Sequence, residues 1–195
     1  MIDMKTKIAG SLFAFSMLIV IIGVVTWKLS FQVRGVVVSS NSQSVATILG
    51  EDYIKYTHPD IGFLLEYPKE LEVRQFLESN DAETIVFQRS GDEERPLEER
   101  LGFQIFITPF NAEGSAITRE RVLQDLPDLT MEEVQEAILG DGTHALIFWT
   151  DDLVIGRTRE VWFTDTGGWL YQITTYAHLD SWLAKILSTW TRNTP

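Results

Sequence analysis

RTREVWFTDTGGWLYQITTYA, residues 157–177, contains two runs of aromatic and β-branched residues separated by Gly167-Gly168. Such residues favour extended strands, whereas paired glycines adopt the left-handed backbone angles that a tight hairpin turn requires. We therefore expect an antiparallel hairpin with strands over residues 157–165 and 169–177. Because strands joined by so short a turn pair with each other, this stretch predicts an antiparallel sheet.

Further short β runs on the N-terminal side extend this sheet. They cover residues 53–57, 62–67, 72–77, 84–90, 103–110 and 143–150. One helix is expected from Thr118 to about Leu126, before Pro127, and a second is capped by Asp180. In the second helix Leu183, Ile186, Leu187 and Trp190 share one face. The expected fold class is α+β, with an antiparallel sheet of about 6–8 strands and helices packed on its faces.

The segment TMEEVQEAILG, residues 130–140, has two interpretations. Thr130 and Glu133 match a capping box, which would begin a helix. Alternatively, residues 133–139 form a strand that pairs across Gly140-Asp141-Gly142 with the run over residues 143–150. We favour the hairpin, in part because of the resemblance described below.

Residues 8–27 read IAGSLFAFSMLIVIIGVVTW and carry no charge. As a helix they would be about 30 Å long, which matches the hydrocarbon core of a bilayer. A cleaved signal peptide usually has a shorter apolar run followed closely by a small-x-small site. The run here is longer, and the small residues Val37 and Ser39 lie too far downstream of it. The sequence therefore predicts an uncleaved membrane anchor.

Lys5 and Lys7 precede this span, and basic residues tend to stay on the cytoplasmic side of a first span. We expect a single-pass protein of the cell membrane with residues 1–7 as a cytoplasmic tail and residues 8–27 as the transmembrane helix. Residues 28–52 would form a tether, and residues 53–195 an extracytoplasmic domain.

The chain is acidic, with a formal net charge of −12, and 27 of its 28 acidic residues follow Lys28. A surface of this sign repels phosphate backbones, so nucleic-acid binding is not expected. The absence of cysteine excludes disulfides, thiolate metal sites and a cysteine nucleophile. No cofactor is expected.

The order of motifs in the chain resembles that of a known superfamily. The motifs are GFLLEYP (62–68), ALIF (145–148), EVWF (160–163), LYQITT (170–175) and KILSTW (185–190). Over residues 53–192 this order resembles the PsbP-like superfamily, which includes many small bacterial surface proteins. The resemblance implies an antiparallel sheet with helices on its faces and a role in binding or assembly, because the family shares no catalytic residue set to carry over.

The segment GDEERPLEER, residues 91–100, is the first candidate for an interaction site. Its carboxylates are Asp92, Glu93, Glu94, Glu98 and Glu99. Their spacing differs from that of an EF-hand loop, and Arg95 and Arg100 offset part of the charge. The simplest interpretation is a solvent-exposed loop without a ligand. A partner-binding loop and a loose Ca²⁺ site are the alternatives.

Other candidates have simpler interpretations. GDGTHA, residues 140–145, matches GxGxxA, but a strand-like run follows it where a nucleotide site needs a helix. Asp151 and Asp152 would point to opposite faces of a strand and are more readily turn residues. The three histidines have no metal-ligand spacing. Trp169, beside the glycine turn, is the tryptophan that we expect to be exposed and available for a contact.

These observations favour a non-enzymatic, membrane-tethered extracytoplasmic module that binds another envelope protein. The first alternative is a carrier or sensor of a small apolar ligand or lipid, which would need a deep pocket. The second is a hydrolase whose triad assembles only in space.

Overall fold

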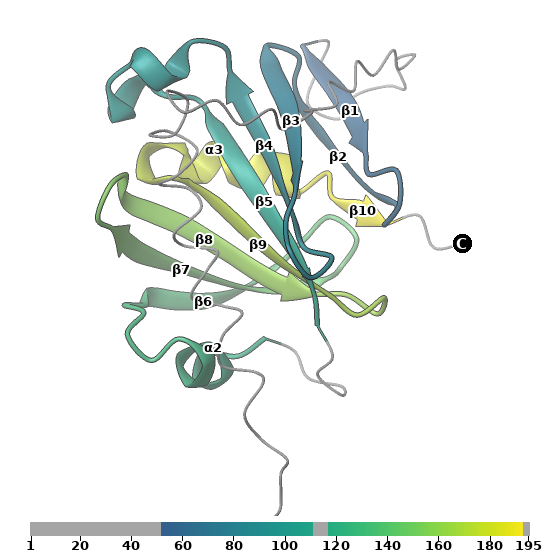
Figure 1. Cartoon of the computed structure of the whole chain (residues 1–195), viewed down its shortest axis with the longest axis vertical. Coiled ribbons are helices and arrows are strands. Elements are labelled where there is room, and N and C mark those ends of the chain that lie inside the picture. Colours follow the sequence, from purple (N-terminus) through teal and green to yellow (C-terminus); the bar gives the residue numbers. More distant parts are fainter. Residues whose placement is uncertain (1–51, 111–116, 193–195) are drawn as a thin grey trace, which may run out of the picture.

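The computed structural model describes residues 52–110 and 117–192 as two antiparallel sheets with two short α-helices (Figure 1). The larger sheet has seven strands in the order β3-β4-β5-β9-β8-β7-β6. In that order they are Leu71–Leu77, Glu83–Arg89, Gly102–Pro109, Trp169–Tyr176, Gly156–Thr164, His144–Asp152 and Glu132–Ile138. The smaller sheet joins β1 (Tyr53–Thr57), β2 (Phe63–Pro68) and β10 (Thr191–Arg192).

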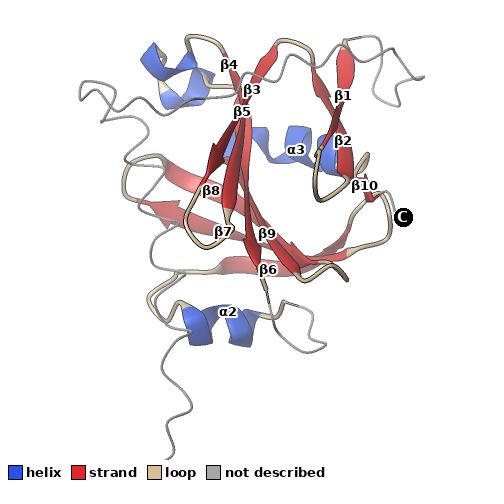
Figure 2. Cartoon of the chain, turned by 45° about the vertical axis from the view of Figure 1, so that its right-hand side comes forward, coloured by secondary structure: helices blue, strands red, loops and turns tan. Residues whose placement is uncertain are grey.

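The main core lies on one face of the seven-stranded sheet, which we call the inner face. Helix α3 (Asp180–Leu187) and the small sheet both pack on it (Figure 2). Trp190 is fully buried at their junction, stacked on Phe63 with ring centroids 4.4 Å apart and edge-on to Phe163 and Tyr171. Aromatic residues of both sheets therefore meet around the end of α3.

A second, smaller core lies on the opposite, outer face. Helix α2 (Arg119–Asp125) places Val122 there against Leu146, Phe148 and Trp162 of β7 and β8. Thr118 caps this helix by accepting a hydrogen bond from the backbone N–H of Arg121 at 3.3 Å. Because both faces of β8 are covered, its residues from Thr158 to Phe163 are all buried, and buried and exposed residues do not alternate along this part of the strand.

The sequence-based expectations of an α+β fold and of an antiparallel sheet are confirmed. The expectation of one sheet is incomplete, because β1, β2 and β10 form a sheet of their own. Residues 132–138 are strand β6, so the hairpin interpretation is right and the capping-box helix is wrong. None of the helices in the described residues is long and apolar enough to cross a membrane, and the expected span over residues 8–27 lies outside those residues.

Gly140 shows why the GDGTHA segment has this shape. The segment forms the turn between β6 and β7, and the N–H of Gly140 donates to the carbonyl of Leu187 at the end of α3. A Cβ at Gly140 would lie 2.2 Å from the carbonyl oxygen of Ser188, closer than atoms can pack. The glycine is required by this backbone contact, and the motif is not the start of a helix that could bind a dinucleotide.

Candidate interaction surface

The loop between β4 and β5, which we call the acidic loop, holds all five carboxylates of residues 91–100. It consists of two 3₁₀ turns, Asp92–Glu94 and Leu97–Glu99. Gly91 enters the loop with φ of 76°, a left-handed conformation that glycine adopts without strain. The first turn therefore directs Asp92 toward the body of the domain.

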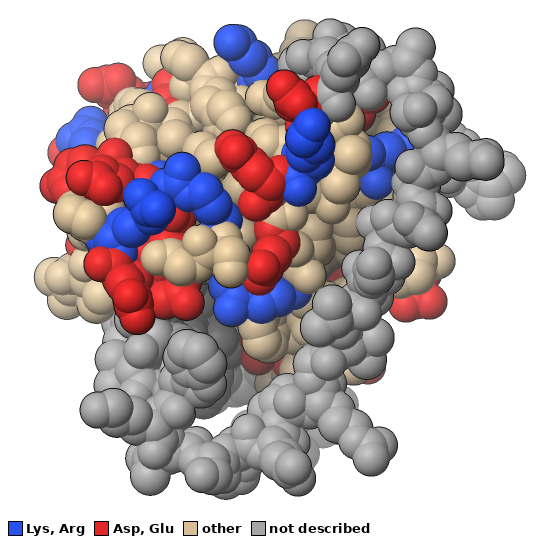
Figure 3. Space-filling view, turned by 90° about the horizontal axis from the view of Figure 1, so that it is seen from above, with Lys and Arg blue, Asp and Glu red and all other residues tan. Residues whose placement is uncertain are grey.

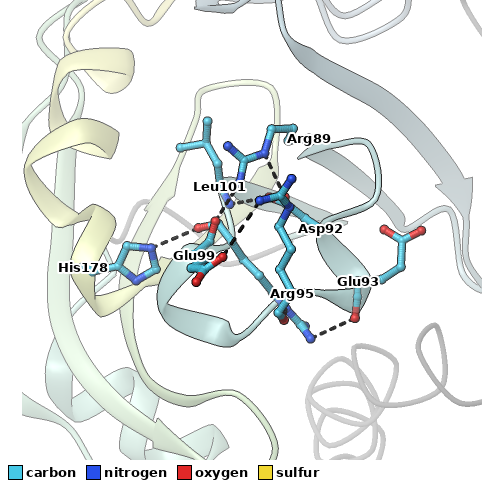
Figure 4. A network of polar contacts seen from close by, with 8 residues as sticks. Arg89, Asp92, Glu93, Arg95, Glu99, Leu101 and His178 are labelled. Atoms are coloured by element: carbon cyan, nitrogen blue, oxygen red, sulfur yellow. Dashed lines mark hydrogen bonds and ion pairs between the residues drawn. The ribbon is translucent and has the colours of Figure 1, made fainter.

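Asp92 is fully buried. It lies within the network of polar contacts that holds the acidic loop (Figure 4). Its Oδ1 accepts a hydrogen bond from Arg89 Nε at 2.8 Å and lies 3.2 Å from Arg95 Nε. Its Oδ2 accepts the backbone N–H of Leu101 at 2.6 Å. One carboxylate thus ties the beginning of the loop to its end, through charge-assisted bonds that are stronger than neutral ones.

Further bonds from arginine side chains hold the backbone of the loop. Arg100 donates to the carbonyls of Arg95 at 2.9 Å and Glu93 at 3.1 Å, and Arg89 donates to the carbonyl of Glu99 at 2.7 Å. His178, on the segment that leads into α3, has its Nε2 3.0 Å from the carbonyl oxygen of Arg100 (Figure 4). The loop is therefore fastened both to itself and to the neighbouring part of the fold.

The other four carboxylates point outward. Glu93, Glu94, Glu98 and Glu99 are all exposed. Among the residues that the structure describes, one ion pair joins them to an arginine, Arg95 to Glu99 at 3.9 Å, and both of its side chains are exposed to solvent. Figure 3, which looks onto this end of the molecule, shows acidic and basic side chains next to each other at its left side. The loop thus presents a fixed set of carboxylates that a basic surface could contact without first ordering the loop.

One of the sequence-based site predictions, Asp92, needs correction, and the structure also places the other candidate, Trp169. Asp92 was grouped with the accessible carboxylates, but it is buried and serves the structure of the loop. Trp169 is partly buried and packs against the main core. It pairs with Pro109, at the end of β5 that is remote from the acidic loop, so the two candidates do not form one surface.

The other tryptophans in the last third of the chain lie mostly in the two hydrophobic cores. Trp162 and Trp190 are buried in the outer and main cores. Trp149 is partly exposed, and the guanidinium carbon of Arg159 lies 3.7 Å from its ring centroid. Trp169 and Trp182 pack against the main core as well, so core packing accounts for most of these tryptophans.

A buried carboxyl that sequence reasoning missed lies on the outer face of β8. Glu160 accepts hydrogen bonds from the hydroxyls of Thr158 at 3.1 Å and Thr174 at 2.9 Å and from the indole N–H of Trp162 at 3.1 Å. All three donors are uncharged. Burial raises the pKa of Glu160 to about 7, and the three hydrogen bonds offset only part of the rise. The signal in the sequence was an acidic residue within the aromatic run EVWF.

A second buried polar group joins the end of β1 to β3 and β4. His58 Nε2 contacts the carboxylate of Glu83, and its Nδ1 accepts the backbone N–H of Ile61 at 3.0 Å. Gln75 also donates to Glu83, at 2.6 Å. Burial by itself would raise the pKa of Glu83, but the hydrogen bonds from His58 and Gln75 outweigh it and lower the pKa. His58 and Glu83 are 2% and 5% exposed, so this pair has no open face for a substrate.

The size of the hollow beneath α2 and the arrangement of the histidines and carboxylates bear on whether the domain could hold an apolar ligand or a metal ion. A hollow between α2 and the outer face, lined by Phe110, Ile117, Arg121, Val122, Asp125, Trp162 and Leu170, has a volume of about 10 Å³. That is the room needed by about one water molecule, so a lipid or another apolar ligand does not fit there. Within residues 52–110 and 117–192 there is no group of three or more histidines and carboxylates that could hold a metal ion.

Comparison with known proteins shows a similarity of fold to a solved structure. No protein-family model matches the chain, and a search of the curated proteins found no match. The solution structure of cyanobacterial PsbP (CyanoP) from Synechocystis sp. PCC 6803 is similar to this chain, with 12% sequence identity and a TM-score of 0.48. The match covers 77% of this chain and 98% of that one. This neighbour is a PsbP protein, and the order of motifs in the sequence resembles the PsbP-like superfamily. The likeness concerns the fold alone.

Proposed function

We propose that this protein is a non-enzymatic extracytoplasmic module, held at the membrane through residues 8–27, that binds another envelope protein through the acidic loop. The observation that carries the proposal is the buried Asp92, which fixes the loop and leaves four carboxylates exposed. A preordered charged surface loses little conformational entropy on binding, and complementary charge accelerates association. The partner would therefore present arginines and lysines.

The two alternatives have less support. A carrier of an apolar ligand would need a far larger cavity than the hollow beneath α2. The His58–Glu83 pair has the chemistry of a base and its orienting carboxylate, but it is closed to solvent. Neither feature offers a site that a ligand or substrate could enter.

In-cell crosslinking of the tagged full-length chain, followed by mass spectrometry, tests the proposal. The variant replaces Glu93, Glu94, Glu98 and Glu99 by glutamine, which removes the charge and keeps the size of the side chains. We expect it to recover the main crosslinked partner with about tenfold lower yield, because electrostatic steering toward the loop is lost.

The matched control replaces four exposed acidic residues outside the loop by their amides. They are Asp81, Glu120, Asp128 and Glu136. This variant has the same net charge as the loop variant and is expected to capture the partner as well as the wild type does. Equal capture by the loop variant and the wild type would exclude the acidic loop as the binding surface. A chain whose domain is moved to an unrelated anchor should still capture the same partner.

A further inference from the structure

The two edges of the seven-stranded sheet differ in how well they are protected from pairing with another strand. Edge strands expose a row of unpaired N–H and C=O groups, and proteins commonly protect them with charges of one sign, bulges or proline. Edge strand β6 has such protection. It carries three exposed glutamates, Glu132, Glu133 and Glu136, and its register breaks between Glu132 and Gln135, where Glu133 has φ of 48°.

Edge strand β3 has none of these features. Its seven residues, LEVRQFL, contain no proline or glycine, and they pair with β4 in an unbroken register from Leu71 to Leu77. In the part of the chain that the structure describes, no strand pairs with the other side of β3. Its two charges, Glu72 and Arg74, are both exposed and cancel, so the strand is neutral where β6 is strongly acidic.

The end of β3 also exposes apolar side chains. Phe76 is 38% exposed and Leu77 is 85% exposed. Exposed apolar residues do not by themselves distinguish the two edges, because Ile138 at the end of β6 is 69% exposed.

We propose that β3 is a pairing edge for β3 of a second copy of this chain, which would join the two seven-stranded sheets across a two-fold axis. The charges of the strand select the occupant and the register. When two β3 strands run antiparallel with Val73 opposite Val73, Glu72 of each copy lies directly opposite Arg74 of the other on the same face of the sheet. Opposite charges in that position stabilise a strand pair.

The alternative register is disfavoured by the same charges. Centring the pair on Arg74 would use all seven residues of β3, but it would place the two arginines opposite each other and leave Glu72 opposite Phe76. Of these two registers, only the one centred on Val73 places opposite charges across from each other; it pairs residues 71–75 of each copy and leaves Phe76 and Leu77 beyond the paired residues. A two-fold axis repeats the Glu72–Arg74 pair, so each dimer contains it twice.

Charge exchange on the full-length chain in detergent micelles tests this proposal, with the dimer dissociation constant measured by energy transfer between labelled copies. In Arg74→Glu both symmetry-related pairs become Glu–Glu, and in Glu72→Arg both become Arg–Arg. We expect each single variant to raise the dissociation constant at least about tenfold. The double variant Glu72→Arg/Arg74→Glu restores opposite charges across the axis and should return within about threefold of the wild type.

A charge change on the opposite edge strand serves as the control, and a cysteine at the expected two-fold axis tests the register. Glu136→Arg on the opposite edge strand should leave the dissociation constant unchanged. Because the chain has no cysteine, Val73→Cys introduces a single thiol, and mild oxidation of membranes should give a disulfide-linked dimer. A monomeric wild type, single variants that associate like the wild type, or a double variant that stays impaired would each overturn the proposal. The last outcome would indicate a different protein strand on this edge.

Discussion

Replacing Glu160 by glutamine is expected to remove a pH-dependent loss of about 3 kcal/mol in unfolding free energy that the wild type undergoes between about pH 4.5 and pH 8. The loss arises because the buried carboxyl titrates near pH 7 in the folded protein and at its ordinary value of 4.5 when unfolded. That difference, at about 1.4 kcal/mol for each pKa unit, gives the expected size.

The direction follows from proton binding. Between the two pKa values the folded state holds a proton on Glu160 that the unfolded state has released, so rising pH favours unfolding. The stabilisation is complete below the unfolded pKa and is lost as the pH rises through the folded pKa. Glu83 has the opposite effect: its pKa is lowered in the folded state, so its contribution is lost as the pH falls through that value.

Glutamine suits the site because it reproduces the protonated form of Glu160. Its carbonyl oxygen can accept from Trp162 and Thr174, and its amide can donate to the hydroxyl of Thr158, which also accepts. The variant should therefore exceed the wild type by less than about 1 kcal/mol at pH 5 and by about 3 kcal/mol at pH 8.

Urea unfolding of the full-length chain in detergent, followed by tryptophan fluorescence at both pH values, measures this difference. Glu120→Gln, an exposed change on α2, is the control and should follow the wild type at both pH values. Parallel stability curves for Glu160→Gln and the wild type would show that the Glu160 carboxyl is ionised already at pH 5.

The sequence predicted those parts of the fold that local chemistry determines. The β8–β9 hairpin depends on two β-prone runs and the Gly167-Gly168 turn, all within residues 157–177. Strand β6 was separable from a helix only through its partner, because Thr130 and Glu133 also satisfy a helix start. Pairing with β7 across the Gly140 turn decided between the two in the fold.

The division into two sheets could not be predicted because it depends on contacts that are remote in sequence. Strand β10 pairs with β2 through Thr191 and Leu64. A strand of two residues is too short for its sequence pattern to predict this partner. The role of Asp92 was hidden for a related reason. Five carboxylates in one segment have the same local composition, and only the positions of Arg89 and the Leu101 N–H in the folded chain distinguish the first of them.

Replacing Asp92 by alanine is expected to lower the unfolding free energy by about 3 kcal/mol, whereas Glu94→Ala in the same turn should change it by less than about 0.5 kcal/mol. The first change leaves the guanidinium of Arg89 and the N–H of Leu101 without their partner, whereas Glu94 is exposed. Removing one member of a buried ion pair usually costs about 3–5 kcal/mol. We expect the lower end because the side chains of Arg89 and Arg95 remain 33% and 49% exposed, so water can solvate them.

The same variant separates the two roles of the acidic loop. Asp92→Ala keeps all four exposed carboxylates, yet it should reduce crosslinking to the partner because the loop that presents them is no longer fixed. Asp92→Asn retains an acceptor for the Leu101 N–H but not the charge, so its unfolding free energy should lie between those of the wild type and Asp92→Ala. If Asp92→Ala lost stability and still captured the partner fully, charge alone would be sufficient for binding. Preordering by Asp92 would then contribute nothing to recognition, since a disordered acidic segment would bind as well.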